Sequence, residues 1–319
     1  MSPSGQLRRA AAVAAALATV LLACASGAGP ASDVSGASYW TVRSADVPEP
    51  VRCFVLTPPS FAADPQKRYP LLLFLHDGSG DEGSLERHGI AADLVRRMRE
   101  GSLREFVLVS PGAPGSWFSD FHDGTAKWET FLAGDLLRQI EASWPVLGGR
   151  ESRGVSGISM GGYGAVKLAL RRPDLFATAS GLSAALTSLD YEDVGGFPSF
   201  VRRDLYRVFG ASSESNSFAR NDVWRLLESA PESPRASFDL YSGTEDSYEV
   251  DNLAARFAAR LIERGFEVRV ELSPGGHDWD YWRAAMPAAA RWHTSRFSYD
   301  VSSTPAVPVG PAARATRTR

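Results

Sequence analysis

Residues 153–164 read RGVSGISMGGYG and place Ser159 between two glycines, Gly157 and Gly161. A strand-like run precedes this serine, and an Ala/Leu-rich stretch of helical character, residues 163–171, follows it. A nucleophile on a sharp strand-to-helix turn requires strained backbone, and the residues two positions to either side must lack bulk for the turn to close. The pattern therefore predicts that Ser159 is a nucleophile exposed at the end of a strand.

A serine hydroxyl is a weak nucleophile at neutral pH and needs a neighbouring base. In chains with this motif the order is serine, then an acid, then histidine, and only His277 and His293 follow Ser159. His277 lies in the turn SPGGHDW, residues 273–279, directly after a strand-like run, where it can reach the strand ends. His293 lies within a helical stretch, residues 281–297, and is expected at the surface. We therefore predict His277 as the general base.

The acid that orients the histidine is expected where the preceding strand ends. Residues 237–242 form a strand-like run that leads into GTED, residues 243–246, so the candidates are Asp246 and Glu245. The carboxylate would accept a hydrogen bond from the imidazole, fix its tautomer and stabilise the imidazolium. Asp278, beside the histidine, is expected to cap a helix instead.

Two backbone N–H groups are expected to bind the negative oxygen that develops during attack. One belongs to Met160, which follows the serine at the N-terminus of the next helix. The second is expected from the loop HDGSGDE, residues 76–82, where Gly78 is the first choice and Ser79 the second. His76 precedes the serine in the chain and is out of order as a base, so we expect it to make structural hydrogen bonds.

Apolar runs of strand length alternate along the chain with stretches of helical period. The runs lie at residues 69–75, 106–110, 153–158, 177–182, 237–241 and 266–272. Residues 128–144 place Leu132, Leu136 and Ile140 on one helix face, and residues 252–264 form a second helix of this kind. Strands that alternate with such helices predict a mostly parallel central sheet with helices on both faces.

Composition narrows the class of function. The 319 residues suit one large domain, and the formal net charge of −3, without long runs of either sign, gives no footprint for nucleic acid. The chain has two cysteines, Cys24 and Cys53, and no clustered metal-ligand pattern. Cys53 lies in an apolar run and is expected to be a small buried side chain. We therefore expect no nucleic-acid partner, no metal and no cofactor.

The N-terminus has the pattern of an export signal. Arg8 and Arg9 precede an uncharged Ala/Leu/Val-rich stretch, residues 10–23, which is too short to span a bilayer. Residues 21–24, LLAC, resemble the lipobox of bacterial lipoproteins, which implies that Cys24 is lipidated and becomes the first mature residue. Cleavage by an ordinary signal peptidase fits the same small residues, so secretion without an anchor stays open. Export is expected in either case.

The chain is thus predicted to have four parts: a signal peptide, a flexible tether, a catalytic domain and a disordered tail. These parts are residues 1–23, 24–38, 39–300 and 301–319.

Residues 183–235 join two strand-like runs and are rich in aromatic side chains. Two interpretations are open: a cap that lines an acyl or alcohol pocket, or a packed helical excursion with its own small core. The aromatic residues are Tyr191, Phe197, Phe200, Tyr206, Phe209, Phe218 and Trp224.

From about residue 71 to residue 282 the chain resembles the esterase D family, which includes tributyrin and feruloyl esterases, S-formylglutathione hydrolases and the antigen 85 mycolyltransferases. The motifs that carry the resemblance are LHDGSGDE (75–82), SWFSDF (116–121), KWETF (127–131), GISMGGYGAVKLAL (157–170), GTEDSYEVDNLAARF (243–257) and GGHDWDYW (275–282). The first departs from the family's LHG-x-x-G-x-E loop, because Asp77 stands where glycine is usual. The second and third are similar to the antigen 85 branch, and the last three to the small-acyl esterases.

This resemblance implies an α/β-hydrolase fold and the roles of nucleophile, acid and base for Ser159, Asp246 and His277, which favours Asp246 over Glu245. It implies a structural role for Glu129 of KWETF. The expected function is hydrolysis of small or medium acyl esters, with acylated carbohydrate among the candidate substrates, through an acyl-enzyme. An acyltransferase that passes the acyl group to a sugar hydroxyl is the alternative, and a non-catalytic binding lipoprotein is a third. The sequence leaves the oligomeric state unknown.

Overall fold

The structure is a computed structural model that describes residues 34–64, 66–188, 199–210 and 216–300. The predicted signal peptide with Cys24, most of the predicted tether and the predicted tail therefore lie outside the described residues. Among the described helices, none combines the length and the apolar character that a bilayer-spanning helix needs.

Eight strands form one sheet in the order β1-β2-β4-β3-β5-β6-β7-β8. The strands from β3 to β8 pair in parallel, while β1 and β2 form an antiparallel edge, so the prediction of a mostly parallel sheet is confirmed. The strands are β1 Ala37–Val42, β2 Val51–Leu56, β3 Leu71–Leu75, β4 Val107–Pro111, β5 Arg153–Ile158, β6 Thr178–Leu182, β7 Ser237–Gly243 and β8 Val268–Ser273.

The antiparallel edge extends the domain towards the N-terminus. Ala37 and Ser38, which the sequence placed at the end of the tether, pair with Leu56 and Val55. Ladder hydrogen bonds use backbone groups, so small polar residues that lack a strand pattern can still join a sheet. In β2, Cys53 is fully buried and unpaired, as expected, and burial raises the pKa of its thiol.

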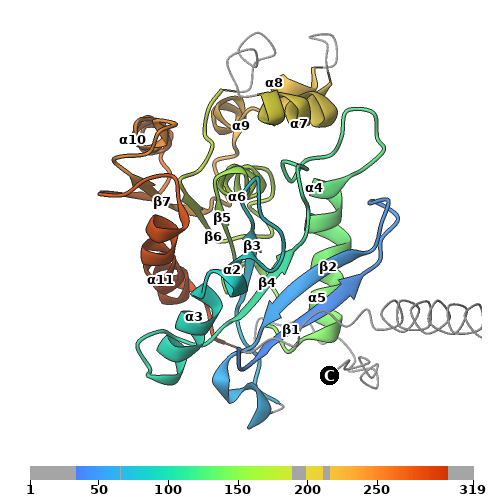
Figure 1. The fold of residues 1–319 in the computed structure, drawn as a ribbon, viewed down its shortest axis with the longest axis vertical. Helices are drawn as coiled ribbons and strands as arrows, with labels where there is room; N and C mark the ends of the chain where they lie inside the picture. Colours follow the sequence, from blue (N-terminus) through green and yellow to red (C-terminus); the bar gives the residue numbers. More distant parts are fainter. Residues whose placement is uncertain (1–33, 65, 189–198, 211–215, 301–319) are drawn as a thin grey trace, which may run out of the picture.

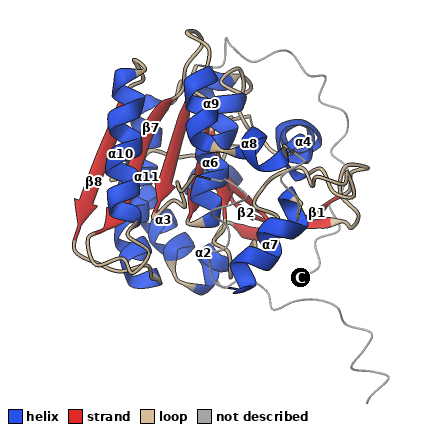
Figure 2. Ribbon diagram, turned by 90° about the horizontal axis from the view of Figure 1, so that it is seen from above, coloured by secondary structure: helices blue, strands red, loops and turns tan. Residues whose placement is uncertain are grey.

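Helices cover both faces of the sheet, and Figure 2 shows the strands as one layer flanked by them. Leu71, Leu73 and Leu75 of β3 join a core with α5, α6 and α10, whereas Leu72 and Phe74 join a core with α3 and α11. A strand buried on both faces is continuously apolar, which explains the run at residues 69–75. The helices of the two layers are α2 Ser84–Arg87, α3 Ile90–Arg99, α4 Trp128–Phe131, α5 Leu137–Ser143, α6 Met160–Arg171, α10 Val250–Glu263 and α11 Trp279–Arg296.

The predicted helix at residues 128–144 is present with one irregularity. Helices α4 and α5 are joined by a π-helical segment, Leu132–Leu136, without a break in the chain's helical course. Leu132, Leu136 and Ile140 are fully buried on one face, so the predicted amphipathic pattern is confirmed. Two short 3₁₀ segments, Pro59–Ala62 and Arg150–Ser152, precede β3 and β5 in the chain.

Between β6 and β7 the chain makes an excursion that Figure 1 shows at one end of the molecule. It contains α7 Ser199–Phe209, α8 Ser217–Asn221 and α9 Val223–Ser229. Phe209 and Phe218 pack against each other with ring centroids 5.3 Å apart and belong to the main core. Trp224 lies edge-on to Phe257 of α10 at 5.0 Å. These three aromatic residues therefore pack the excursion onto the domain, while Tyr191 and Phe197 lie outside the described residues.

Candidate active site

Ser159 lies between the last residue of β5 and the first residue of α6. Its backbone angles, φ 53° and ψ −112°, fall where residues with a side chain are strained by about 1–3 kcal/mol. A Cβ on Gly157 would come within 2.2 Å of the carbonyl oxygen of Gly161, and a Cβ on Gly161 within 2.0 Å of that of Leu75. The two glycines therefore let this turn close, as the sequence predicts.

The strained turn is held by backbone hydrogen bonds on both sides. The N–H of Ser159 donates to the carbonyl oxygen of Leu182 at 2.9 Å. The carbonyl oxygen of Ser159 accepts from the N–H groups of Tyr163 and Ala185, at 3.0 and 3.1 Å. Because α6 and the end of β6 both fix this backbone, the side chain of Ser159 is presented in one direction.

The structure brings Ser159, His277 and Asp246 together. The Nε2 atom of His277 lies 3.0 Å from Oγ of Ser159, and its Nδ1 atom lies 2.6 Å from Oδ2 of Asp246. A carboxylate only accepts, so Nδ1 carries the proton and Nε2 is left to accept from the serine hydroxyl. Asp246 is buried, and its Oδ1 accepts a further hydrogen bond from the N–H of Tyr248 at 2.9 Å.

Three of the parallel strands supply these side chains. Asp246 lies in the loop after β7, and His277 in the loop between β8 and α11. Asp278 accepts from the N–H of Tyr281 at 3.0 Å and caps α11, as predicted. The carboxyl ends of parallel strands lie at one edge of a sheet, which is why residues more than a hundred positions apart meet there.

Two aromatic residues that the sequence reasoning did not single out hold the imidazole. Tyr248 and Trp282 each lie edge-on to His277, with ring centroids 4.9 and 5.1 Å away. The indole N–H of Trp282 donates to Oγ of Ser183 at 3.0 Å, which fixes the indole against the end of β6. Both aromatic residues lie within the acid and histidine motifs of the chain, and this proximity in sequence was the available signal.

The two amides predicted to bind an oxyanion lie next to each other. Met160 is the first residue of α6, so its N–H has no partner within the helix. A Cβ built on Gly78 would lie 3.9 Å from Cβ of Met160, which places the loop after β3 beside the nucleophile turn. The N–H of Ser79, the second choice for this role, donates to Oδ2 of Asp77 at 3.1 Å.

His76 is fully buried and makes the structural hydrogen bonds that the sequence reasoning assigned to it. Its Nε2 accepts from the N–H of Ala113 at 2.9 Å, so Nδ1 bears the proton and donates to the carbonyl oxygen of Asp77 at 2.7 Å. Burial lowers the pKa of His76, which keeps the ring neutral.

His293 is not at the surface, and this prediction was wrong. Its side chain is fully buried, with Nδ1 2.7 Å from Oγ1 of Thr178 and Nε2 2.9 Å from Oγ of Ser180. Both partners lie on β6. The face of α11 that carries His293 therefore packs against the sheet. A single imidazole at helical spacing did not reveal on which side of the helix it lies.

Because of His293, the protein is expected to become less stable as the pH is lowered. Burial, with a smaller contribution from the Arg296 guanidinium, lowers its pKa to about 3 from an ordinary value of 6.5. Between those values the unfolded chain binds a proton that the folded chain refuses, so the free energy of unfolding decreases as the pH falls from 6.5 towards 3. The slope is at most about 1.4 kcal/mol per pH unit. Thermal unfolding of His293→Gln should show a shallower dependence of Tm on pH than the wild type; equal dependence would contradict this origin.

Glu129 of the KWETF motif has the structural role that the resemblance implies. Its Oε2 lies 2.9 Å from Nζ of Lys167 and 2.7 Å from Nη1 of Arg171, both on α6. Lys167 is fully buried and also donates to the carbonyl oxygen of Phe118 at 3.1 Å. Burial opposes ionisation of Glu129, but the two cations outweigh it and lower its pKa; burial lowers the pKa of Lys167 to about 8.

Glu129→Ala is expected to destabilise the fold by about 3–5 kcal/mol, because it leaves the ammonium of Lys167 buried without its counter-charge. The double variant Glu129→Ala, Lys167→Met removes both charges and should recover part of this loss. Denaturant unfolding measures both free energies. A double variant no more stable than Glu129→Ala would show that the unpaired charge is not the cause.

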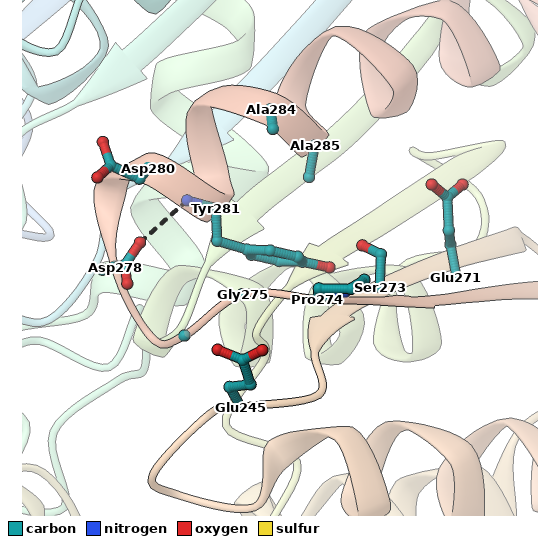
Figure 3. Close-up of a pocket in the computed structure, with 11 residues that line it drawn as sticks. Glu245, Glu271, Ser273, Pro274, Gly275, Asp278, Asp280, Tyr281, Ala284 and Ala285 are labelled. Atoms are coloured by element: carbon teal, nitrogen blue, oxygen red, sulfur yellow. Dashed lines mark hydrogen bonds between the residues drawn. The ribbon is translucent and has the colours of Figure 1, made fainter.

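A cavity of about 470 Å³ lies between the edge strand β8 and α11 (Figure 3). Gly276 and Asp278, the neighbours of His277, line it, but Ser159 and His277 do not. The exposed Glu245, the alternative acid, also lines this cavity and has no hydrogen bond to the imidazole. The cavity is therefore not where an ester would meet Ser159. Within the described ranges, no group of three or more metal-ligand side chains is close enough to hold a metal ion.

Taken together, the parallel sheet and the serine at its strand-to-helix turn define a hydrolase of the α/β-hydrolase class. A protein-family model then identifies the family. The chain belongs to the Esterase family, whose model matches residues 44–293, more than three-quarters of the sequence. The resemblance to esterases is thus confirmed, and the protein is an ester hydrolase.

Curated relatives are similar over about two-thirds of the chain. An acetyl esterase of Caldicellulosiruptor saccharolyticus is 26% identical over 64% of this chain and 80% of its own length. Esterase Rv1288 of Mycobacterium tuberculosis is 28% identical over 66% of this chain, which spans only about half of that relative. The diacylglycerol acyltransferase/mycolyltransferase Ag85A of Mycobacterium ulcerans is 26% identical over 57% of this chain and 61% of its own length.

Solved structures share the fold. A ferulic acid esterase has a TM-score of 0.69 at 24% identity, with 82% of this chain and 98% of that one covered. The serine hydrolase FphF of Staphylococcus aureus has a TM-score of 0.67 at 23% identity, with 82% and 99% covered. At these identities the likeness establishes the α/β-hydrolase fold.

Proposed function

We propose that the protein hydrolyses esters with small or medium acyl groups, with Ser159 as nucleophile, His277 as general base and Asp246 as the orienting acid. One observation carries the assignment: the unbroken hydrogen-bonded series from Oγ of Ser159 through the imidazole to a buried carboxylate. Binding alone would need neither the strained turn nor this histidine. The third candidate of the sequence reasoning, a non-catalytic binding protein, is therefore disfavoured.

In the proposed reaction Oγ of Ser159 attacks the ester carbonyl while Nε2 of His277 takes its proton. The N–H groups of Met160 and Gly78 bind the oxyanion that forms. The imidazolium then protonates the leaving alcohol, and an acyl-enzyme remains. Water then gives a proton to the same imidazole and attacks the acyl carbon. The imidazolium returns that proton to Oγ of Ser159 as the bond from this oxygen to the acyl carbon breaks, and the acid is released. Every step uses groups of this chain and water.

A small acyl group is favoured by the similarity to an acetyl esterase and by the small-acyl motifs at residues 157–170, 243–257 and 275–282. The test is a series of p-nitrophenyl esters from acetate to laurate, with kcat/KM measured for each. We expect the highest kcat/KM at about two to four acyl carbons. A maximum at long acyl chains, or no turnover of any ester, would contradict the proposal.

An acyltransferase is the second candidate, because Ag85A is among the relatives and KWETF is similar to its branch. In this chain Glu129 of that motif is paired with Lys167 and Arg171. The motif therefore indicates a structural role for Glu129 and gives no evidence of an acyl acceptor. Product analysis separates the two: a transferase gives acylated sugar when glucose or trehalose is added, whereas a hydrolase gives free acid at an unchanged rate.

We also propose that the protein is exported and anchored through a lipid on Cys24. The support is the sequence alone: two arginines, an uncharged stretch and LLAC at residues 21–24. In a bacterial host, radiolabelled palmitate should enter the wild type and not Cys24→Ser. A soluble exported wild type without label would favour ordinary secretion instead.

A further inference from the structure

The loop after β3 contains a buried carboxylate that the proposed mechanism does not use. Asp77 is 4% exposed and stands where the family resemblance leads one to expect glycine. Its Oδ2 accepts two hydrogen bonds from Ser79, one from the backbone N–H at 3.1 Å and one from the hydroxyl at 2.6 Å. Its Oδ1 is buried and has no hydrogen bond among the described residues.

This carboxylate occupies one of the two amides that could serve as the second oxyanion donor and leaves the other free. The N–H of Ser79 is directed at Asp77 and cannot also be directed at a substrate oxygen. Gly78 is exposed, lies beside Met160, and donates no backbone hydrogen bond within the described part of the chain. Of the two neighbours, Gly78 is therefore the one with a free N–H next to the nucleophile turn.

Asp77 is itself fixed from both sides. Its carbonyl oxygen accepts from Nδ1 of His76 at 2.7 Å and from the N–H of Gly80 at 3.1 Å. His76 is anchored in turn by the N–H of Ala113. A Cβ on Gly80 would lie 2.3 Å from Oδ1 of Asp77, so the glycine leaves room for the carboxylate. The loop is thus built around this side chain.

We propose that Asp77 is a positioning residue that holds the loop so that the N–H of Gly78, and not that of Ser79, meets the oxyanion. The inference rests on the proposed function. A donor held in place before reaction stabilises the developing charge without reorganisation. A displacement of about 1 Å in such a group costs up to about 10²-fold in rate.

The experiment compares Asp77→Ala with Asp77→Asn, which keeps an acceptor oxygen for Ser79. For p-nitrophenyl acetate we expect Asp77→Ala to lower kcat about 10- to 100-fold with KM nearly unchanged, because only the transition state loses its donor. An alkylboronic acid forms a tetrahedral adduct on serine, so its inhibition should weaken by the same factor. Asp77→Asn should stay within about fivefold of the wild type in both measurements.

Ser79→Ala removes one of the two hydrogen bonds to Asp77 and should slow turnover about fivefold. If Asp77→Ala does not fold, Ser79→Ala and Asp77→Asn together test the role of Asp77. Active enzyme is counted by labelling Ser159 with a fluorophosphonate. Equal kcat in Asp77→Ala and wild type, an equal loss in the Ala and Asn variants, or an unchanged Ser79→Ala would overturn the inference. A wild type without ester hydrolysis would instead overturn the proposed function.

Discussion

Ser159→Ala is expected to lower kcat for p-nitrophenyl esters by about 10⁶-fold, because it removes the atom that forms the acyl-enzyme. The imidazole of His277 loses the hydroxyl 3.0 Å from its Nε2 atom, while the backbone of the turn keeps its hydrogen bonds to Leu182, Tyr163 and Ala185. Residual catalysis from the oxyanion donors and from binding would remain. The measurement is the initial rate of nitrophenol release, with the same preparations tested for labelling by a fluorophosphonate.

The matched control is Ser229→Ala, in which an exposed serine of α9 is changed. It should retain the rate and the labelling of the wild type. Circular dichroism and Tm should show that both alanine variants are folded; Ser159→Ala can be slightly more stable, since alanine has no hydroxyl to bury. If Ser159→Ala keeps more than about 1% of the wild-type kcat, the assignment of the nucleophile is wrong.

Asp246→Asn is expected to lower kcat by about 10⁴-fold, and the geometry explains why. The N–H of Tyr248 donates to Oδ1 of Asp246, so an asparagine would keep its oxygen there and turn its NH₂ towards His277. The imidazole would then have to accept at Nδ1 and carry its proton on Nε2. A protonated Nε2 cannot take the proton of Ser159, so the base is lost with little change in structure.

Glu245→Gln is the paired control, because Glu245 was the alternative acid. It is exposed, lines the cavity beside α11, and contributes no hydrogen bond to the imidazole. Its kcat should stay within about threefold of the wild type, as for an exposed charge at a distance. The opposite pattern, a large loss in Glu245→Gln and a small one in Asp246→Asn, would exchange the two roles.

Local sequence was sufficient wherever the signal and the structure involve neighbouring residues. The predicted run at residues 153–158 is β5 itself: after Arg153 it is apolar or small throughout, as expected for a strand buried on both faces. The turn at Ser159 was predictable for the same reason: its strain and the two close approaches arise within a few residues. The buried faces of α5 and α10 follow from helical spacing.

Long-range pairing was not accessible in this way. Nothing in the run around Ala37 indicates that it pairs with β2, because the ladder uses backbone groups that every residue has. The prediction for His293 was wrong because its buried ring forms hydrogen bonds with Thr178 and Ser180, which lie on a strand more than a hundred residues earlier. The counter-charges of Glu129, on α6, could not be identified from KWETF alone.

The sequence by itself predicted the class of the protein, the proposed nucleophile and the candidate base, since these depend on residue types at fixed spacing and on their order along the chain. The resemblance favoured Asp246 over Glu245, but only the tertiary structure placed Asp246 against the imidazole and showed that Asp77 accepts a hydrogen bond from the N–H of Ser79. Neighbouring candidates such as Asp246 and Glu245 carry the same functional group and differ by one position in the sequence. Which of them faces the site is set by backbone direction, and that direction is fixed by contacts with distant strands and helices.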